Sequence, residues 1–196
     1  MSVKFKSLEI TVLYMKHLCH KWNTWKVLAF FFEQPFGRFY LREVARELKM
    51  SPSTVFRALS YLEKDGLVTV QKARNASYYE AAVSPLFKYL KVAHTVSKLS
   101  ALKIAELVRE KSNGLNCFLL FGSAARGEDD ANSDYDFVLI AGRSNLASLD
   151  LNEKLGREVN LKKFTISEWK KVSEKNKAFY FDVIKDSIAL IGEKPI

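Results

Sequence analysis

The stretch from Cys117 to Ile140 constrains the fold of this chain more than any other, and its sequence is CFLLFGSAARGEDDANSDYDFVLI. It contains two short apolar runs, 117–121 and 137–140, separated by glycine, small and acidic residues. Short continuous apolar runs with such boundaries are typical of buried strands. We therefore expect two strands of one sheet, joined by a helical turn and an acidic loop.

Two carboxylates, Asp134 and Asp136, lead into the second of these runs. Side chains two positions apart on a strand point to the same face, so these carboxylates should lie together. Neighbouring carboxylates repel one another unless a cation lies between them, and hard oxygen ligands suit Mg²⁺. The pair therefore predicts a site for Mg²⁺, or for Mn²⁺, which takes similar ligands.

Gly122 and Ser123 follow the first run, where the helical turn should begin. Glycine lets a phosphate approach the backbone closely, and the free N–H groups at a helix N-terminus attract anions. A phosphate cradle that faces a metal-binding acidic pair is the arrangement that nucleotidyl transfer from a nucleoside triphosphate requires.

The pattern Gly122-Ser123, ten residues, then Asp134-x-Asp136 resembles the signature of the DNA polymerase β-like nucleotidyltransferase superfamily. The string GSAARG…SDYD is similar to its minimal nucleotidyltransferase (MNT) branch, and the resemblance extends over about residues 112–194. It implies a further strand at 157–163, a helix near 166–174 and a nucleoside triphosphate as substrate or ligand. The residues implied for the site are Asp134 and Asp136 as metal ligands, and Gly122, Ser123, Arg126 and Ser133 as nucleotide-binding groups.

The superfamily usually has a third carboxylate on the next strand, and the position that resembles it here is Asn160. Asparagine can offer a carbonyl oxygen to a metal, but it cannot accept a proton or supply charge. Loss of a general base typically lowers a rate by about 10²–10⁴-fold. Glu158 is an alternative source of a carboxylate, since it lies on the same strand face about 7 Å away. Whether the domain transfers a nucleotide or only binds one stays open.

Residues 24–82 carry a second recognisable pattern. Thr24 and Ser51 are expected to cap helices, Pro52 to stand in a first helical position, and Asp65-Gly66 to end a helix. The expected elements are helices 24–32, 41–49 and 52–64, an extended piece 36–40, and strands 67–71 and 77–82.

This order resembles the winged helix-turn-helix family, and LREVARELKMSPSTVFRALSYLEKDGLV is similar to the MarR/ArsR-type transcription regulators. The resemblance implies that 52–64 enters the major groove, where arginine bonds guanine edges. It also implies a homodimer, because such regulators usually pair to bind two half-sites. The alternative is a module for protein docking or dimerisation. The DNA contacts implied are Ser53, Thr54 and Arg57 from the helix, and Arg74 and Asn75 from the wing tip.

The charge of the chain is unevenly divided. The net charge is +9, and residues 1–100 hold 16 Lys/Arg against 7 Asp/Glu, whereas residues 101–196 hold 15 of each. A basic half indicates a polyanionic partner, most simply double-stranded DNA. We therefore expect an α+β chain of two domains: a winged helix-turn-helix domain over 1–83, connecting helices over 84–113, and a nucleotidyltransferase domain with a small mixed sheet over 114–196.

The cysteines and the apolar runs indicate the cellular compartment of the protein. Cys117 falls in an expected buried strand, so Cys19 and Cys117 should remain thiols in a reducing compartment. The longest apolar run has six residues, too few to cross a membrane, and the N-terminus lacks a signal-peptide pattern. We expect a cytoplasmic protein. His17, Cys19 and His20 lack a fourth metal ligand and are interpreted as structural.

Three functions compete at this point. In the first, the chain is a nucleotidyltransferase; by resemblance, its acceptor would be a protein or nucleic-acid hydroxyl, as when the antitoxin of a HEPN–MNT pair adenylylates its toxin. In the second, it is a DNA-binding transcription regulator that senses a nucleotide without transferring it. In the third, the MNT fold is a scaffold for a partner such as a HEPN-type protein. We expect a DNA-binding regulator that binds Mg²⁺–nucleotide.

Overall fold

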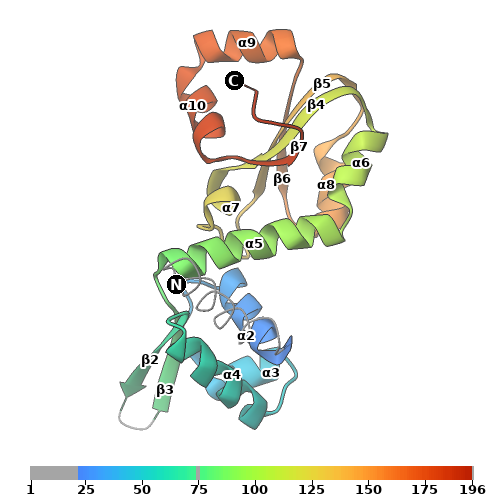
Figure 1. Cartoon of the computed structure of the whole chain (residues 1–196). Helices are drawn as coiled ribbons and strands as arrows, with labels where there is room; N and C mark the ends of the chain where they lie inside the picture. The colour runs from blue at the N-terminus through green and yellow to red at the C-terminus, as the bar shows by residue number, and fades with distance from the viewer. Residues whose placement is uncertain (1–21, 74–75, 196) are drawn as a thin grey trace, which may run out of the picture. The chain divides into compact units, whose positions relative to one another are not determined.

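The computed structural model describes residues 22–73 and 76–195 of the chain. They form two compact units, which meet in the sequence at Phe87 and Lys88 (Figure 1). This division lies inside 84–113, the segment expected to connect two domains. The candidate wing-tip residues Arg74 and Asn75 lie outside the described residues, as do His17, Cys19 and His20.

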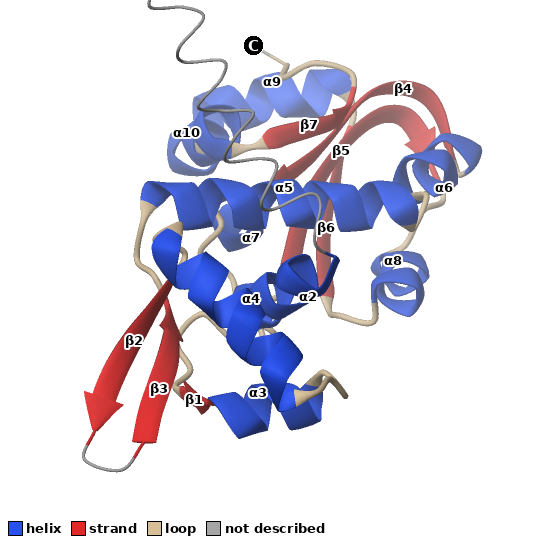
Figure 2. Ribbon diagram, turned by 60° about the horizontal axis from the view of Figure 1, so that its bottom comes forward, coloured by secondary structure: helices blue, strands red, loops and turns tan. Residues whose placement is uncertain are grey.

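The first unit is a small helical domain with a three-stranded antiparallel sheet of order β1-β3-β2. Helix, strand, helix, helix and hairpin follow one another, which is the order of a winged helix-turn-helix (Figure 2). The elements are α2 (Trp22–Glu33), β1 (Phe39–Tyr40), α3 (Leu41–Glu47), α4 (Pro52–Lys64), β2 (Val68–Ala73) and β3 (Ala76–Ala81).

The ends of α4 follow from its sequence. The hydroxyl of Ser51 accepts the N–H of Thr54 at 3.2 Å, and Pro52 occupies the first helical position. Gly66, with φ +66°, takes the left-handed conformation that follows the end of the helix. The cap predicted at Thr24 is wrong. Helix α2 already includes Trp22, and Thr24 is 2% exposed on its packed face, so this residue belongs to the core and not to the end of the helix.

The core of the first unit forms where α2 packs against α4. Leu28 and Phe31 of α2 are fully buried, and so are Val55 and Leu59 of α4. Full burial of one such side chain contributes about 1.5–3 kcal/mol. The helical period of these apolar residues therefore explains both the helices and their packing.

The second unit contains a four-stranded mixed sheet of order β6-β5-β4-β7. β5 is antiparallel to β4 and parallel to β6, and β7 is antiparallel to β4. The α+β class with a small mixed sheet is therefore confirmed. The strands are β4 (Ser112–Phe121), β5 (Tyr135–Ser144), β6 (Val159–Phe164) and β7 (Ile188–Ile191). The helices are α5 (Pro85–Ala101, which begins at the end of the first unit), α6 (Ile104–Glu110), α7 (Gly122–Arg126), α8 (Ser148–Leu155), α9 (Ile166–Lys175) and α10 (Lys177–Asp186).

Helices cover both faces of this sheet (Figures 1 and 2). On one face Phe118 and Phe137 pack with residues of α5, α6 and α8. On the other face Leu119 and Val138 pack with Trp169 of α9 and Val183 of α10. Because β4 and β5 are buried on both sides, their sequences are continuous apolar runs rather than alternating ones. The second of these faces is called the α9/α10 face below.

The segment 84–113, expected to be helical throughout, is interrupted. Lys103 adopts a left-handed conformation with φ 54° between α5 and α6, and Ser112 already belongs to β4. No glycine or proline marks this break. The turn allows Leu99 of α5 and Ile104 of α6 to enter the same core, a tertiary requirement that the local sequence does not show. In the part of the chain that the structure describes, no helix is long and apolar enough to cross a membrane.

Candidate functional site

The topology of the second sheet brings three strand ends to one edge. β5 and β6 are parallel and start together, whereas the antiparallel β4 ends where β5 starts. Asp136 is therefore in register with Phe121 on one side and with Asn160 on the other. Asp134 directly precedes β5, and Gly122 directly follows β4. Residues from three separate stretches of sequence thus meet at this edge.

The two carboxylates converge on a single amide. The Nδ2 of Asn160 donates to Oδ2 of Asp134 at 3.3 Å and to Oδ1 of Asp136 at 3.2 Å. The positive end of the amide dipole lies between two negatively charged oxygens, and it offsets part of their repulsion. A divalent cation that bound the same two oxygens would do this more strongly, because it carries full charge.

Gly122 packs directly against Asp136. Its φ is +73°, and a Cβ there would collide with Oδ2 of Asp136 and lie 3.2 Å from its Cγ. Glycine is therefore required at this position for two reasons: the backbone is left-handed, and a side chain would collide with Asp136. Without a side chain in between, a phosphate at the Gly122-Ser123 turn could lie beside the acidic pair.

The donor set at this edge fits one Mg²⁺ or Mn²⁺. The ligands would be carboxylate oxygens of Asp134 and Asp136, with the carbonyl oxygen of Asn160 available once its amide turns. Among residues 22–73 and 76–195, no group of three His, Cys, Asp or Glu side chains could hold a metal. The structure therefore does not bring Glu158 into the acidic pair. The backbone oxygen of Glu158 instead accepts the N–H of Tyr135 at 2.9 Å.

The loop before Asp134 is held by its own hydrogen bonds. The hydroxyl of Ser133 donates to Oδ1 of Asp130 at 2.9 Å and accepts the N–H of Asp130 at 2.9 Å. The hydroxyl of Ser133 also holds the pKa of Asp130 below its usual range, and the N–H of Asn132 adds to this. Ser133, which the resemblance implies to be a nucleotide-binding residue, uses its hydroxyl to shape this loop.

A buried ion cluster anchors the same loop and was missed in the sequence. The carboxylate of Asp129, 5% exposed, lies 3.1 Å from Nζ of Lys91 and accepts from Nη1 of Arg157 at 3.1 Å. Lys91 also donates to the backbone oxygen of Asp129, and the Arg157 guanidinium lies 4.7 Å from the ring centre of Tyr135. Buried charges are tolerated when they are paired, so this cluster should hold the loop in place. Asp129 belongs to the expected acidic loop, where no local pattern marks it as buried, so the sequence offered no signal.

Arg126, expected to neutralise phosphate charge, is paired within the protein. Its Nε donates to Glu128 at 3.0 Å, and its Nη1 lies 3.9 Å from Asp182 of α10. The hydrogen bond to Glu128 raises the pKa of Arg126, and the bond from Lys88 at 2.8 Å, followed by that from Arg126, lowers the pKa of Glu128. The charge of Arg126 is therefore already partly neutralised by carboxylates of the protein.

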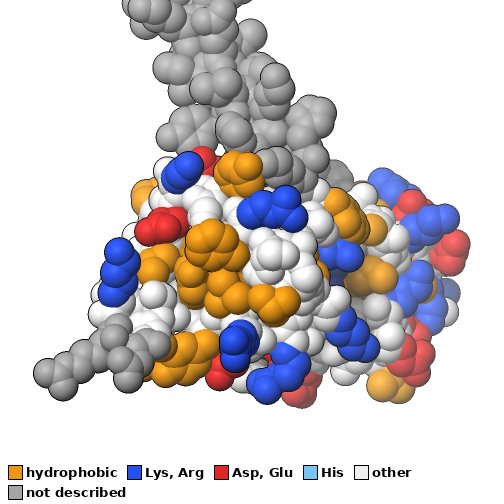
Figure 3. All heavy atoms as spheres, turned by 90° about the horizontal axis from the view of Figure 1, so that it is seen from below, with side chains coloured by type: hydrophobic (Ala, Val, Ile, Leu, Met, Phe, Trp, Pro, Cys, Tyr) orange, Lys and Arg blue, Asp and Glu red, His pale blue; other side chains and the backbone are white. Residues whose placement is uncertain are grey.

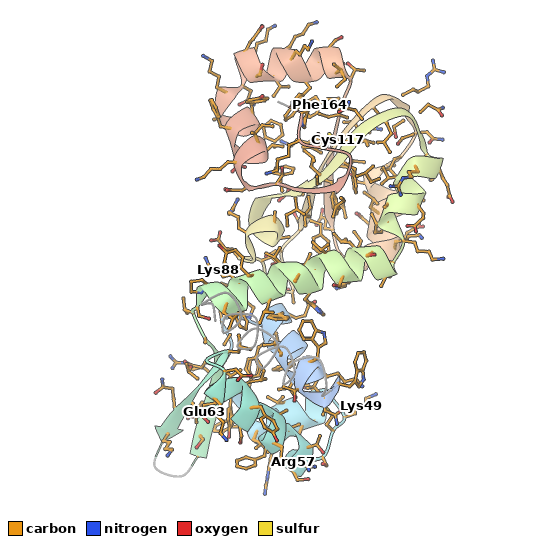
Figure 4. All side chains as sticks on the ribbon, in the orientation of Figure 1. Lys49, Arg57, Glu63, Lys88, Cys117 and Phe164 are labelled. Atoms are coloured by element: carbon orange, nitrogen blue, oxygen red, sulfur yellow. The ribbon has the colours of Figure 1, made fainter. Side chains whose placement is uncertain are left out.

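In the first unit, α4 presents two of its expected DNA contacts to solvent. Ser53 and Arg57 are exposed, and Figure 4 shows Arg57 pointing out from α4. Thr54 is only partly exposed, and the hydroxyls of Ser53 and Thr54 lie 3.1 and 2.8 Å from that of Ser51 in the helix cap. Arg57 is therefore the expected DNA contact that stands freest on this helix.

The face that carries α3, α4 and the β2–β3 hairpin combines apolar and basic side chains. Figure 3 shows hydrophobic side chains gathered in its middle, with lysine and arginine side chains around them. Phe56 of α4 is 55% exposed and Tyr40 is 38% exposed, and the hydroxyls of Tyr40 and Tyr78 are hydrogen bonded at 2.9 Å. Such a face suits a large partner that offers both negative charge and apolar contacts.

Residues 102–195 match the protein family described as "Polymerase beta, Nucleotidyltransferase". The second unit thus contains a nucleotidyltransferase domain of the polymerase β type, as the resemblance implied. No curated protein matches the chain.

Several solved structures are similar to parts of this chain. Reduced HlyU from Vibrio cholerae is 17% identical with a TM-score of 0.37, and the match covers 45% of this chain and 88% of HlyU. The homodimeric winged helix-turn-helix DNA-binding domain of Mb0332 from Mycobacterium bovis is 20% identical with a TM-score of 0.40, over 50% of this chain and 86% of that one. A toxin–antitoxin structure with AMP-PNP is 21% identical with a TM-score of 0.34, over 50% of this chain and 74% of that one.

Proposed function

We propose that this protein binds DNA through its winged helix and binds a nucleoside triphosphate with Mg²⁺ in its nucleotidyltransferase domain. The observation that carries the second part is the edge where Asp134 and Asp136 converge on one point and Gly122 packs against Asp136. Two carboxylates held together there have no evident use in packing, since both are partly exposed. A bound cation would account for their arrangement.

The residues at this edge of the sheet would have separate roles in binding the metal ion and the phosphates. Asp134 and Asp136 would hold Mg²⁺ or Mn²⁺, which would neutralise phosphate charge and polarise the α-phosphate. The backbone at Gly122 and Ser123 would receive the β- and γ-phosphates, because no side chain separates this turn from Asp136. The loop anchored by Asp129 would keep Asp134 in place.

Asn160 supports a second candidate function, in which the nucleotide is sensed and released unchanged. It stands beside the acidic pair, where a proton-accepting carboxylate would help to activate an acceptor hydroxyl. An amide cannot do this, and the described residues supply no third acid there. In the transferring alternative, a hydroxyl of a protein or nucleic acid attacks the α-phosphorus and pyrophosphate leaves. The loss of a base would then slow transfer by about 10²–10⁴-fold.

The DNA-binding part of the proposal rests on α4 and on charge. Arg57 and Ser53 are exposed on the helix that corresponds to the recognition helix of a winged helix-turn-helix. All of the excess positive charge of the chain lies in residues 1–100. We extend the proposal to a homodimer on double-stranded DNA. A HEPN-type protein is the alternative partner.

One experiment separates these functions. The full-length protein is incubated with α-labelled ATP, CTP, GTP and UTP, with Mg²⁺ or Mn²⁺ and an extract of the source organism. Label on a protein or nucleic acid, lost in the Asp134→Asn/Asp136→Asn variant, would support transfer and identify the acceptor class. Mg²⁺-dependent binding without label would support sensing. A wild-type protein that bound no nucleotide under any of these conditions would overturn the proposal.

A further inference from the structure

Two adjacent lysines of β6 lie on opposite faces of the sheet. Lys163 donates from Nζ to the backbone oxygen of Leu146, which belongs to the core on the α5/α6/α8 side. Lys162 lies on the α9/α10 face, and its Nζ is 4.3 Å from the ring centre of Phe179 in α10. This is also the face of Asn160, because residues two apart on a strand share a face. The nucleotide site and Lys162 thus occupy one surface of the sheet.

Two aromatic rings in contact, those of Phe179 and Phe121, connect Lys162 with the Gly122-Ser123 turn. The ring centre of Phe179 lies 5.6 Å from that of Phe121, which ends β4 immediately before Gly122. Along β6, Lys162 lies about 7 Å from Asn160, the residue whose amide contacts both carboxylates. Lys162 therefore shares a face with the acidic pair, and its ammonium group contacts a ring that packs on the residue before the turn.

The charge of Lys162 is available, unlike that of its basic neighbours. Arg126 is paired with Glu128, and Lys91 and Arg157 are paired with Asp129. Lys162 is exposed, and within the described ranges it has neither an ion pair nor a hydrogen bond to a carboxylate. Its contact with the Phe179 ring is of the weaker, exposed type, so the flexible side chain can turn toward an anion.

We propose that Lys162 binds the β- and γ-phosphates of the nucleoside triphosphate held at Asp134 and Asp136, a step that rests on the proposed function. Arg126, the cation expected for this task, is held by Glu128 and Asp182, and Lys162 takes its place. The asparagine at position 160 contributes to this arrangement. An aspartate there, on the same face and two residues away, would compete with the nucleotide for the ammonium group.

The test compares Lys162→Gln with Lys163→Gln in the full-length protein. Both variants remove one positive charge from the same strand, so they change the net charge equally. Titration calorimetry in the presence of Mg²⁺ first measures the affinity of the wild type for ATP, GTP, CTP and UTP. The nucleotide that binds most tightly, and the corresponding monophosphate, are then titrated into the wild type and each variant. We expect Lys162→Gln to weaken triphosphate binding about tenfold, the effect of one charge-assisted hydrogen bond. Monophosphate binding by Lys162→Gln, and triphosphate binding by Lys163→Gln, should stay within about twofold of wild type.

Each outcome of these titrations supports or overturns the proposed role of Lys162. Triphosphate binding by Lys162→Gln equal to that of the wild type would overturn the role of Lys162 and leave the proposed function standing. An equal loss for triphosphate and monophosphate would overturn it as well. A wild type that bound none of the four triphosphates would overturn both. Lys162→Arg keeps the charge and should keep the affinity; a loss as large as in Lys162→Gln would mean that packing against Phe179 matters rather than charge.

Discussion

Gly122 and Asp136 lie so close together that no side chain fits between them, although 13 positions separate them in the sequence. This contact joins the turn after β4 to the acidic pair at the start of β5. Any change that separates the two would move the expected phosphate position away from the expected metal position. Gly122 is therefore the position at which the geometry of the site can be tested most directly.

Gly122→Ala should abolish Mg²⁺-dependent nucleotide binding, because the new methyl group would displace the carboxylate of Asp136. Gly156→Ala is a matched control, since Gly156 has φ +63° and nothing within 4 Å of the position of its Cβ. Both variants should lose about 1–2 kcal/mol of stability from the left-handed backbone, measured by urea unfolding. Only Gly122→Ala should lose the nucleotide. Wild-type affinity in Gly122→Ala would mean that the nucleotide binds elsewhere.

Asn160→Asp should make the stability of the protein depend on Mg²⁺. Three carboxylates would then meet without the amide donor that now joins Asp134 and Asp136, so the variant should melt at a lower temperature in EDTA and recover with Mg²⁺. Thermal unfolding with and without the ion measures this, and the wild type should respond less. If Asn160 limits transfer, the variant should also transfer label about 10²-fold faster or more. An unchanged rate would support binding without transfer.

Arg57→Ala should weaken binding to a specific DNA site about tenfold, because the variant loses a side chain placed to bond a guanine edge. The site is first obtained by selection from random double-stranded DNA, and affinities are compared at one salt concentration. Arg109→Ala, at an exposed position of α6 in the second unit, is the control and should bind as the wild type does. Equal affinities of Arg57→Ala and wild type would remove α4 from the DNA interface.

The stability of the protein should fall as the pH rises through the range 9 to 11. Burial raises the pKa of the Cys117 thiol to about 11, so the folded protein keeps a proton that the unfolded chain releases near pH 9. The unfolded state then binds fewer protons than the folded state, and alkaline pH favours unfolding. Denaturant unfolding at several pH values measures the effect. Cys117→Ala should be less stable at neutral pH but should lack this part of the alkaline loss, and identical pH profiles would contradict the assignment.

Patterns within short stretches were predicted well, since they depend on neighbouring residues. The cap at Ser51 and the apolar runs of β4 and β5 express local hydrogen bonding and hydrophobic period, and the structure has them where expected. The strands themselves extend further, because their outer residues pair with partners distant in sequence. The break at Lys103 has a similar origin, since it serves the packing of Leu99 and Ile104.

The sequence by itself determined the two-domain α+β class, the strand that begins at the Asp134/Asp136 pair, the turn at Gly122 and the asparagine at position 160. These features depend on residue types, on the period of the apolar residues and on the spacing of motifs, all of which can be read from the local sequence. Only the tertiary structure decided which charges are paired. Asp129 is buried and forms ion pairs with Lys91 and Arg157. Arg126 lies against the carboxylates of Glu128 and Asp182. The ammonium group of Lys162 contacts an aromatic ring, on the same face of the sheet as the acidic pair. The physical reason is that the environment of a charged side chain is set by the neighbours that folding brings to it, and these come from distant parts of the sequence.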